Sequence, residues 1–369
     1  MTHMGEISGI LFFLIGAMTI VELIDAHEGF TIISARLNSD NKRKLLWLIG
    51  VTTFFLSAIL DNLTTTIVMI LVIRTLINDE KERWVFTGII IIAANSGGAW
   101  SPLGDVTTTM LWIGGQITAW NIVHRLILPS LVSLIVPLIL ATFMISRKKM
   151  EIHDRRQVKS NGVSTFEKST VLIVGILGLF MVPVFKSLTH LPPFMGMLLS
   201  LGIIWVFVEL LHRNKNEVDK DTLSVVAALR RLNIPTLLFF LGILLAVSAL
   251  QSSSLLGYWA SSLSKYIVNQ NVLIMIIGGL SSVIDNVPLV ASVQGLYGLN
   301  IYPTDHYFWE FMAYAAGTGG SILIIGSAAG IAAMGMEKIT FFWFLKRFSV
   351  LALVGYLSGA VTYIFLSNI

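Results

Sequence analysis

The chain has 369 residues, of which 55% are apolar and 12% charged, a composition that excludes a soluble globular domain and is typical of a protein in lipid. It contains no cysteine, so disulfides, thiolate metal sites and cysteine nucleophiles are excluded. The net charge of +4 would suggest nucleic-acid binding in a soluble protein, but here the basic residues lie in short loops and predict membrane orientation. We therefore expect an all-α polytopic membrane protein whose surroundings are the lipid bilayer, with no nucleic acid as a partner.

Apolar runs follow one another along the whole chain, and several are too short to cross a bilayer. At about 1.5 Å per helical residue, the run 45–60 reaches about 24 Å and the run 271–284 about 21 Å, whereas the hydrocarbon core is about 30 Å thick. The runs are 8–24, 45–60, 63–77, 84–94, 103–113, 119–145, 169–186, 193–211, 234–250, 271–284, 287–298, 307–316, 322–334 and 340–366.

The dipeptide Asp-Asn occurs twice inside apolar segments, at Asp61-Asn62 and at Asp285-Asn286, 224 residues apart. A charged side chain in the middle of a bilayer costs at least about 2.5 kcal/mol, so a carboxylate there predicts an ion, a proton or water beside it. The repeated carboxylate therefore indicates ion transport. A role in helix packing alone is the weaker interpretation.

The distribution of lysine and arginine favours a hairpin at each Asp-Asn pair. If each pair is the tip of a re-entrant helical hairpin and the amino terminus lies outside, all 25 basic residues except Arg125, Lys186 and Lys265 fall in inside loops. This is a strong positive-inside bias. One long crossing over residues 45–77 would place the most basic loop, 147–168, outside. Two short spanning helices would keep the same orientation and stay open as an alternative.

The two halves of the chain share more than the Asp-Asn pairs. Asn-Ser-Gly-Gly from Asn95 resembles Gly-Thr-Gly-Gly from Gly317, and Phe-Leu-Ile-Gly ending at Gly16 resembles Phe-Leu-Gly ending at Gly242. Under the topology above, the halves run in opposite directions, which is an architecture of secondary transporters. The predicted organisation is a first inverted repeat (1–146, hairpin 45–77, broken helix 84–113), a cytoplasmic linker (147–168), scaffold helices with an interfacial helix (169–233), and a second inverted repeat (234–369, hairpin 271–298, broken helix 307–334).

The span around residues 94–105 is predicted to be broken, because two glycines and Pro102 interrupt an apolar helix and free backbone groups that lipid cannot hydrogen-bond. Freed carbonyls and nearby side-chain oxygens are hard ligands that suit a small cation such as sodium. A kink that only packs helices closely is the alternative, here and at residues 317–321. The polar side chains at the first break are Asn95, Ser96, Asp105, Thr107 and Thr108.

Three carboxylates, Asp61, Asp105 and Asp285, lie near the two tips and the two breaks, and no lysine or arginine does. A site of net negative potential attracts cations and repels anions. A desolvated carboxyl group holds either a proton or a metal ion, and this competition is sufficient chemistry for exchange. Polar neighbours that could complete the coordination are Ser57, Asn62, Thr64, Thr65, Ser281, Ser282 and Asn286, although such serines and threonines more often bond their own helix backbone.

These motifs make the sequence resemble the NhaD-type sodium/proton antiporters. The resemblance rests on Ser-Ala-Ile-Leu-Asp-Asn (57–62) and Asn-Ser-Gly-Gly-Ala-Trp-Ser-Pro-Leu-Gly-Asp (95–105), with Ser-Ser-Val-Ile-Asp-Asn-Val-Pro (281–288) and Gly-Thr-Gly-Gly (317–320), and it covers nearly the whole chain. The family belongs to a superfamily that also holds divalent-anion/sodium symporters and arsenite permeases. The resemblance implies electrogenic exchange of internal Na⁺ or Li⁺ for external protons at the cytoplasmic (inner) membrane, no cofactor, a homodimer, and elevator-like movement of the hairpin-bearing domain.

Carried over by motif, the resemblance also implies which residues hold the cation and the proton. They are Ser57, Asp61, Asn62, Asn95, Asp105, Thr107, Thr108, Ser281, Asp285 and Asn286, with the Na⁺ or Li⁺ ion itself at Asp61, Asn62, Asp105, Asp285 and Asn286. Glu22, Asp25 and His27 lie at the inner end of the first span, where the resemblance suggests proton uptake or pH sensing and the alternative is that they extend to the interface. The related anion symporters have neutral tip motifs, so the aspartates here favour cations.

The sequence departs from the family's pattern in two places. Two spans, 169–186 and 193–211, precede the second repeat, whereas none precedes residue 8, so the chain looks short by two helices at its amino terminus. The positions that match Asn95 and Asp105 in the second half are Gly317 and Ser327, which leaves most of the charge in the first half.

Two other functions stay open. The first is a sodium-coupled anion symporter or an arsenite-type permease of the same superfamily. The second and more remote is an intramembrane aspartyl protease, because two membrane aspartates can share a proton. Such enzymes carry Tyr-Asp and Gly-x-Gly-Asp, where this chain has Leu60-Asp61 and Leu103-Gly104-Asp105, and a protease does not explain the repeat. We therefore expect a transporter and not an enzyme.

Overall fold

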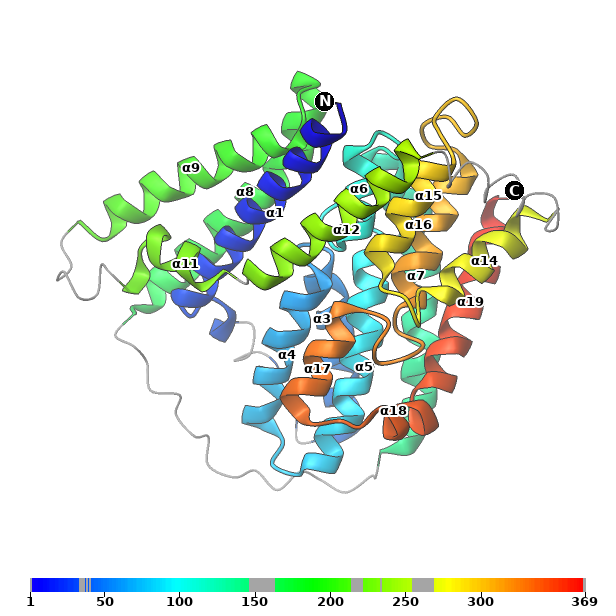
Figure 1. Cartoon of the computed structure of the whole chain (residues 1–369). Coiled ribbons are helices and arrows are strands. Elements are labelled where there is room, and N and C mark those ends of the chain that lie inside the picture. The colour runs from blue at the N-terminus through cyan, green and yellow to red at the C-terminus, as the bar shows by residue number, and fades with distance from the viewer. Residues whose placement is uncertain are drawn as a thin grey trace. The chain divides into compact units, whose positions relative to one another are not determined.

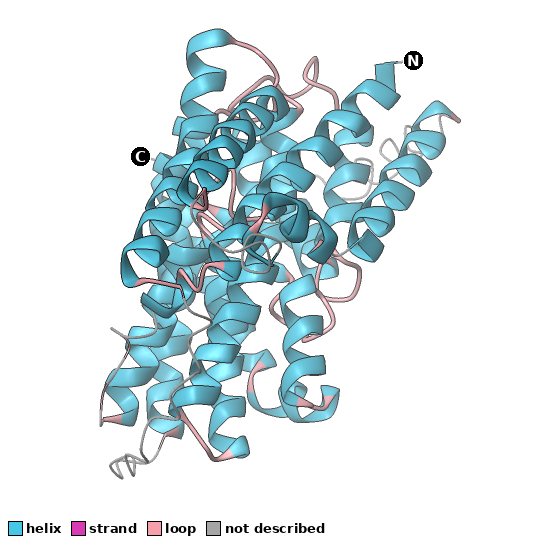
Figure 2. Ribbon diagram, turned by 90° about the vertical axis from the view of Figure 1, so that its left-hand side faces the viewer, coloured by secondary structure: helices cyan, strands magenta, loops and turns pink. Residues whose placement is uncertain are grey.

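The computed structural model describes residues 2–32, 37, 39, 41–145, 163–213, 222–232, 234–253 and 269–367. The regular elements of these ranges are helices, which confirms the prediction of an all-α chain (Figure 2). Most of the predicted linker, 147–168, lies outside the described residues. The helices are α1 (Thr2–Ala26), α3 (Lys42–Ser57), α4 (Asn62–Leu76), α5 (Glu80–Ala99), α6 (Val106–Ile113), α7 (Ala119–Met144), α8 (Thr165–Thr189), α9 (Pro193–Leu211), α11 (Val225–Arg231), α12 (Ile234–Ser252), α14 (Gln270–Leu280), α15 (Asn286–Leu296), α16 (Tyr307–Gly319), α17 (Ala328–Glu337), α18 (Phe341–Arg347) and α19 (Ser349–Ser367).

Polar caps explain where several helices begin. At the start of α8, the Ser164 hydroxyl accepts a hydrogen bond from the backbone N–H of Glu167, and the Glu167 carboxylate accepts one from the backbone N–H of Ser164. Asp79 caps α5 through the backbone N–H of Glu82, at 2.7 Å. Polar residues between the apolar runs therefore set these helix boundaries.

Five helices of the described ranges are long and apolar enough to cross a membrane: α1 from Ile7 onwards, α7, α8, α9 and α19. Helices α17 and α18 pass the same test only as a pair, bent by 114° at a short break. Helices α4 and α14 are apolar, but their 15 and 11 residues reach only about 22 Å and about 16 Å, short of a hydrocarbon core of about 30 Å. The chain is therefore a multi-pass membrane protein in which some apolar helices are too short to cross alone.

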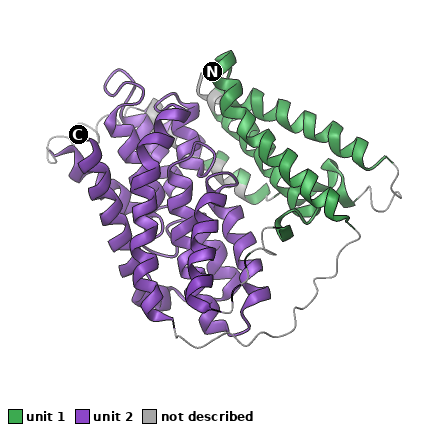
Figure 3. Ribbon diagram, turned by 180° about the vertical axis from the view of Figure 1, so that it is seen from behind, with its two compact units in different colours: residues 1–38, 156–242 green, residues 39–155, 243–369 purple. Residues whose placement is uncertain are grey.

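The chain divides into two compact units (Figure 3). Unit 1 comprises Met1–Asn38 and Arg156–Gly242, and unit 2 comprises Ser39–Arg155 and Ile243–Ile369. Both units are discontinuous in sequence, whereas the repeats and linker of the sequence analysis are continuous segments. The division into inverted repeats stays a prediction.

Unit 1 is built around α1, which packs against α8, α9 and α11. Small residues allow the close approach, since a Cβ at Gly175 of α8 would collide with Ile24 of α1. Within residues 169–233, where an interfacial helix is predicted, the short helix α11 has Val225 and Ala228 buried and Arg230 and Arg231 exposed. This helix is therefore amphipathic.

Unit 2 contains two sets of broken helices (Figure 1). The chain leaves the helix between α3 and α4 and between α5 and α6, and again between α14 and α15 and between α16 and α17. The Ser57 hydroxyl donates to the Ala94 carbonyl at 2.6 Å, and the Ser281 hydroxyl donates to the Ala316 carbonyl at 2.8 Å. Each of these bonds fastens the break at an Asp-Asn pair to the neighbouring broken helix.

Glycine permits the helices to cross at these breaks. A Cβ at Gly97 would overlap the Phe54 carbonyl, and one at Gly319 would overlap the Gly278 carbonyl. We expect Gly97→Ala to reduce the free energy of unfolding by about 1–3 kcal/mol, because a larger residue at a closed contact forces the backbone apart. The melting temperature in detergent measures this. Gly335→Ala in α17 is the matched control, because no atom lies within 4 Å of the added Cβ; an equal loss in both variants would contradict the explanation.

Candidate functional site

Four helices of unit 2 begin at the breaks, and a polar residue precedes each of them. The residues before α4, α6, α15 and α17 are Asp61, Asp105, Asp285 and Ser327. Asp61 and Asp285 are 224 residues apart, and Asp105 and Ser327 are 222 apart, so the starting positions repeat. A helix N-terminus has unpaired backbone N–H groups and a partial positive charge, so it stabilises a nearby carboxylate.

Asp105 is the centre of a hydrogen-bond network and is only 1% exposed. The backbone N–H of Thr107 donates to its Oδ1 at 3.0 Å. The side-chain amides of Asn62 and Asn286 donate to its Oδ2, at 2.9 and 3.0 Å. These two amides come from the two Asp-Asn pairs, so a single carboxylate joins both predicted tips.

Asn95 extends this network toward the second broken helix and is fully buried. Its Oδ1 accepts a hydrogen bond from the Asn62 amide at 3.1 Å. Its own amide donates to the Ser327 hydroxyl at 3.0 Å and to the Ile91 carbonyl at 3.1 Å. The structure therefore brings together Asn62, Asn95, Asp105 and Asn286 of the predicted site.

The two tip carboxylates differ in their surroundings. Asp61 has a φ of +82°, uncommon for a residue other than glycine, and its carboxylate accepts from the Thr64 backbone N–H at 2.9 Å and the Thr64 hydroxyl at 2.7 Å. Asp285 makes no such cap bond, since Pro288 stands where Thr64 stands in the first half and has neither an N–H nor a hydroxyl. One oxygen of Asp285, Oδ1, is buried without a hydrogen-bond partner in the described part of the chain, so it stays available to a ligand.

Several threonine hydroxyls near the network are also buried without a partner among the described residues. They are those of Thr65 and Thr66 in α4 and of Thr108 in α6. Buried polar oxygens are nearly always paired in proteins, so these are candidates for ligands of a bound ion. Thr107 is fully buried beside Asp105, whereas the hydroxyls of Ser57 and Ser281 already donate to helix carbonyls. The assignment of the ten residues as ion ligands stays a prediction.

The donor set suits a small monovalent cation or a proton. No lysine or arginine of the described ranges forms an ion pair with Asp61, Asp105 or Asp285. Nor do these ranges contain a group of three or more histidine, cysteine, aspartate or glutamate side chains that could hold a metal ion. Divalent sites usually gather several carboxylates, whereas here single carboxylates are surrounded by amides and hydroxyls.

Ser327 is a residue of this network that the sequence analysis did not place in the site. Its hydroxyl accepts a hydrogen bond from the Asn95 amide, and it caps α17 by accepting another from the backbone N–H of Gly330. The sequence does carry a signal for Ser327: it follows Asp105 by 222 residues, which makes it the counterpart of Asp105 in the second half of the chain.

Glu22, Asp25 and His27 belong to unit 1. Nδ1 of the fully buried His27 is 2.7 Å from the Leu23 carbonyl oxygen, and its Nε2 is 3.2 Å from Nε2 of His212. A carbonyl only accepts, so it fixes the proton of neutral His27 on Nδ1. Asp25 is exposed and Glu22 partly exposed. A role of these residues in proton uptake or pH sensing stays a prediction.

Comparison with known proteins finds several sodium/proton antiporters similar to this chain. A family model described as "Citrate transporter" matches residues 4–303. Sodium/proton antiporter 1 of Arabidopsis thaliana is 47% identical over 99% of this chain, which spans 63% of that protein. Sodium/proton antiporter 2 of the same plant is 44% identical over 99% of this chain and 86% of its own length. The Na⁺/H⁺ antiporter NhaD of Vibrio parahaemolyticus is 32% identical over 94% of this chain and 88% of its own length.

Proposed function

Because this chain belongs to the NhaD-type family of sodium/proton antiporters, we propose that it exchanges Na⁺ or Li⁺ for protons across a membrane, with Asp105 as the central carboxylate. The transported ions are then its small-molecule partners, and no cofactor takes part. The cytoplasmic membrane as its location and a homodimeric assembly follow from the same family resemblance and belong to the proposal.

The observation that carries the proposal is the burial of Asp105 between the amides of Asn62 and Asn286, with no cationic side chain paired to it in the described ranges. An ionised carboxylate in such a place is costly unless a cation lies beside it. Two states are therefore favourable: the protonated acid, and the carboxylate with a small cation. Because binding of one ion excludes the other, release of Na⁺ on one side and of H⁺ on the other gives exchange.

Alternating access requires the ion site to face one side of the membrane and then the other. Asn62 and Asn286 join both Asp-Asn breaks to Asp105, so the breaks and the ion site are connected and can move together as one body. We infer an elevator-type movement of the hairpin-bearing part against a scaffold, supported by the breaks around the network and by the family resemblance.

Everted membrane vesicles from cells that lack other antiporters test this function. Respiration acidifies the vesicle interior and quenches acridine orange. We expect addition of NaCl or LiCl at neutral to alkaline pH to reverse the quenching, and KCl or choline chloride to leave it unchanged. Absence of any response from a protein shown to be inserted in the membrane would contradict the proposal.

The name of the matching family model favours one alternative, the transport of an anion such as citrate. The three carboxylates Asp61, Asp105 and Asp285 oppose it, because their negative potential repels anions. Uptake of radiolabelled citrate into right-side-out vesicles, with and without a sodium gradient, separates the two. Sodium-dependent citrate uptake without proton exchange would replace the antiport proposal.

A further inference from the structure

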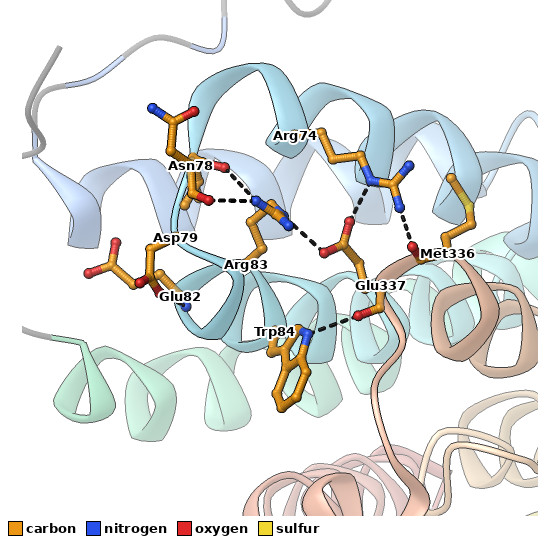
Figure 4. A network of polar contacts seen from close by, with 9 residues as sticks. Arg74, Asn78, Asp79, Glu82, Arg83, Trp84, Met336 and Glu337 are labelled. Carbon is orange, nitrogen blue, oxygen red and sulfur yellow. Dashed lines mark hydrogen bonds and ion pairs between the residues drawn. The ribbon is translucent and has the colours of Figure 1, made fainter. Parts of the chain in front are cut away.

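Three helices of unit 2, α4, α5 and α17, pack against one another and meet through polar side chains at both ends. At one end they contribute Asn62, Asn95 and Ser327 to the network beside Asp105. At the other end they meet in a cluster of charges (Figure 4). This charge cluster consists of Arg74, Arg83 and Glu337.

Glu337 is the centre of the charge cluster and is only 3% exposed. Nε of Arg74 donates to its Oε1 at 2.6 Å, and Nε of Arg83 donates to its Oε2 at 2.9 Å. The Trp84 indole N–H donates to the Glu337 carbonyl at 2.9 Å, and the Arg74 guanidinium donates to the Met336 carbonyl. These carbonyls lie at the end of α17, where the last backbone carbonyls of a helix have no hydrogen-bond partner within it. Arg74 and Trp84, from the first half of the chain, therefore cap a helix of the second half.

The stability of α17 does not explain why a glutamate stands at position 337. A carboxylate in the last turn of a helix is unfavourable, because that end carries partial negative charge. Burial adds a desolvation cost, and replacement of buried ionic clusters by apolar side chains is often neutral or stabilising. The attested benefit of such clusters is a unique register between packed elements.

The spacing of residues along the three helices links this register to the hydrogen-bond network around Asp105. Asn62 and Arg74 are 12 residues apart in α4, Arg83 and Asn95 are 12 apart in α5, and Ser327 and Glu337 are 10 apart. At about 1.5 Å per residue, the three distances are about 18, 18 and 15 Å, equal to within one helical turn. On all three helices, the charge cluster therefore lies at nearly the same distance from the hydrogen-bond network around Asp105. A helix that slid by one residue along its axis would disturb both.

We propose that Glu337 is a positioning residue for ion transport. Through Arg74 and Arg83 it holds α4, α5 and α17 in register as one body, so that Asn62, Asn95 and Ser327 keep their places beside Asp105. The consequence for the ion rests on the proposed function, whereas the register of the helices does not.

The register can be measured without transport, because a chain without cysteine accepts a pair of unique labels. Leu71 in α4 and Ile331 in α17 are 47% and 52% exposed, so cysteines there can carry spin labels, and pulsed electron paramagnetic resonance then gives the distance between the helices. Two variants are compared in this background: Glu337→Gln, and the triple change Arg74→Met, Arg83→Met, Glu337→Leu. The triple change removes all three charges together and is expected to fold, since no charge is left unpaired.

We expect the inter-helix distance to shift or its distribution to broaden in both variants. Glu80→Gln is the control, because Glu80 is an exposed acid in the first turn of α5, outside the cluster, and it should leave the distance unchanged. A distance in both variants equal to that of the unaltered chain would overturn the proposal.

Kinetics then test the link to the ion. In vesicles, Glu337→Gln and the triple variant are expected to raise the apparent KM for Na⁺ or Li⁺ about 2- to 30-fold, the range of 0.5–2 kcal/mol typical of coupling at a distance. Glu337→Asp, which keeps the charge, should restore part of the loss. An altered distance with unchanged KM would overturn the positioning role. If the unaltered chain shows no exchange, the proposed function fails, and the distance measurement still decides the register.

Discussion

Replacement of Asp105 by asparagine is expected to abolish sodium- and lithium-driven proton release, down to the signal of vesicles without the protein. The amide has nearly the shape of the carboxyl group, but its NH₂ takes the place of an oxygen that accepts hydrogen bonds here, so the melting temperature is measured beside exchange to separate lost transport from lost stability. The amide can neither release a proton nor carry the charge that holds a cation, and Asp105 is the carboxylate that both Asn62 and Asn286 contact. Acridine orange fluorescence in vesicles with matched protein amounts measures the loss.

Asp305→Asn is the matched control for this substitution. Asp305 is likewise a hydrogen-bond acceptor, from the backbone N–H and hydroxyl of Thr118 at 2.6 and 2.8 Å, but it lies in the loop before α16. Its replacement should leave exchange at the wild-type rate. Exchange by Asp105→Asn at a rate comparable to that of the control would rule out Asp105 as the central carboxylate.

Asp61→Asn and Asp285→Asn are each expected to stop exchange while the protein still inserts. Asparagine caps a helix about as well as aspartate, so Asp61→Asn keeps the bond from the Thr64 N–H and should cost less than about 1 kcal/mol of stability. Asp285 makes no cap bond, so its replacement should cost even less. Exchange rates and melting temperatures of both variants, measured on the same preparations, test this separation of transport from stability.

Retention of wild-type exchange in both tip variants would eliminate competition of cation and proton for buried carboxylates as the mechanism. A loss confined to Asp285→Asn would assign the ion to the tip whose carboxylate has an unpaired oxygen. Comparison of exchange by the Asp61→Asn and Asp285→Asn variants therefore tests whether the unpaired Oδ1 of Asp285 binds the ion.

The helical fold and its breaks could be predicted from the sequence, because aspartate is costly inside an apolar helix, and Asp61, Asp105 and Asp285 each stand directly before the start of a helix. The meeting of Asn62, Asp105 and Asn286 was implied by the family resemblance, but the residues alone do not predict it. Asn62 and Asn286 lie 43 and 181 residues from Asp105, and no local pattern states which of the polar residues at four breaks will touch. That choice depends on the packing of whole helices, which periodicity does not encode.

The repeated Asp-Asn pair predicts equivalent surroundings for Asp61 and Asp285, but these surroundings differ, for a reason that is visible in the sequence. Thr64 follows Asp61 by three residues and supplies two hydrogen bonds, whereas Pro288 follows Asp285 at the same spacing and supplies none. Attention to the third residue after each aspartate, the one that closes a helix cap, would have separated the two tips.

The long separation between Asp105 and Asn286 has a consequence for biosynthesis. Ribosomes add about 5–20 residues per second, so the 181 residues between them take roughly 10 to 40 s to make. During that interval Asn286 has not been made, so its amide cannot donate to Asp105. The early half must therefore keep an incomplete ion site sheltered from lipid, by water or by the insertion machinery, until the second half is translated.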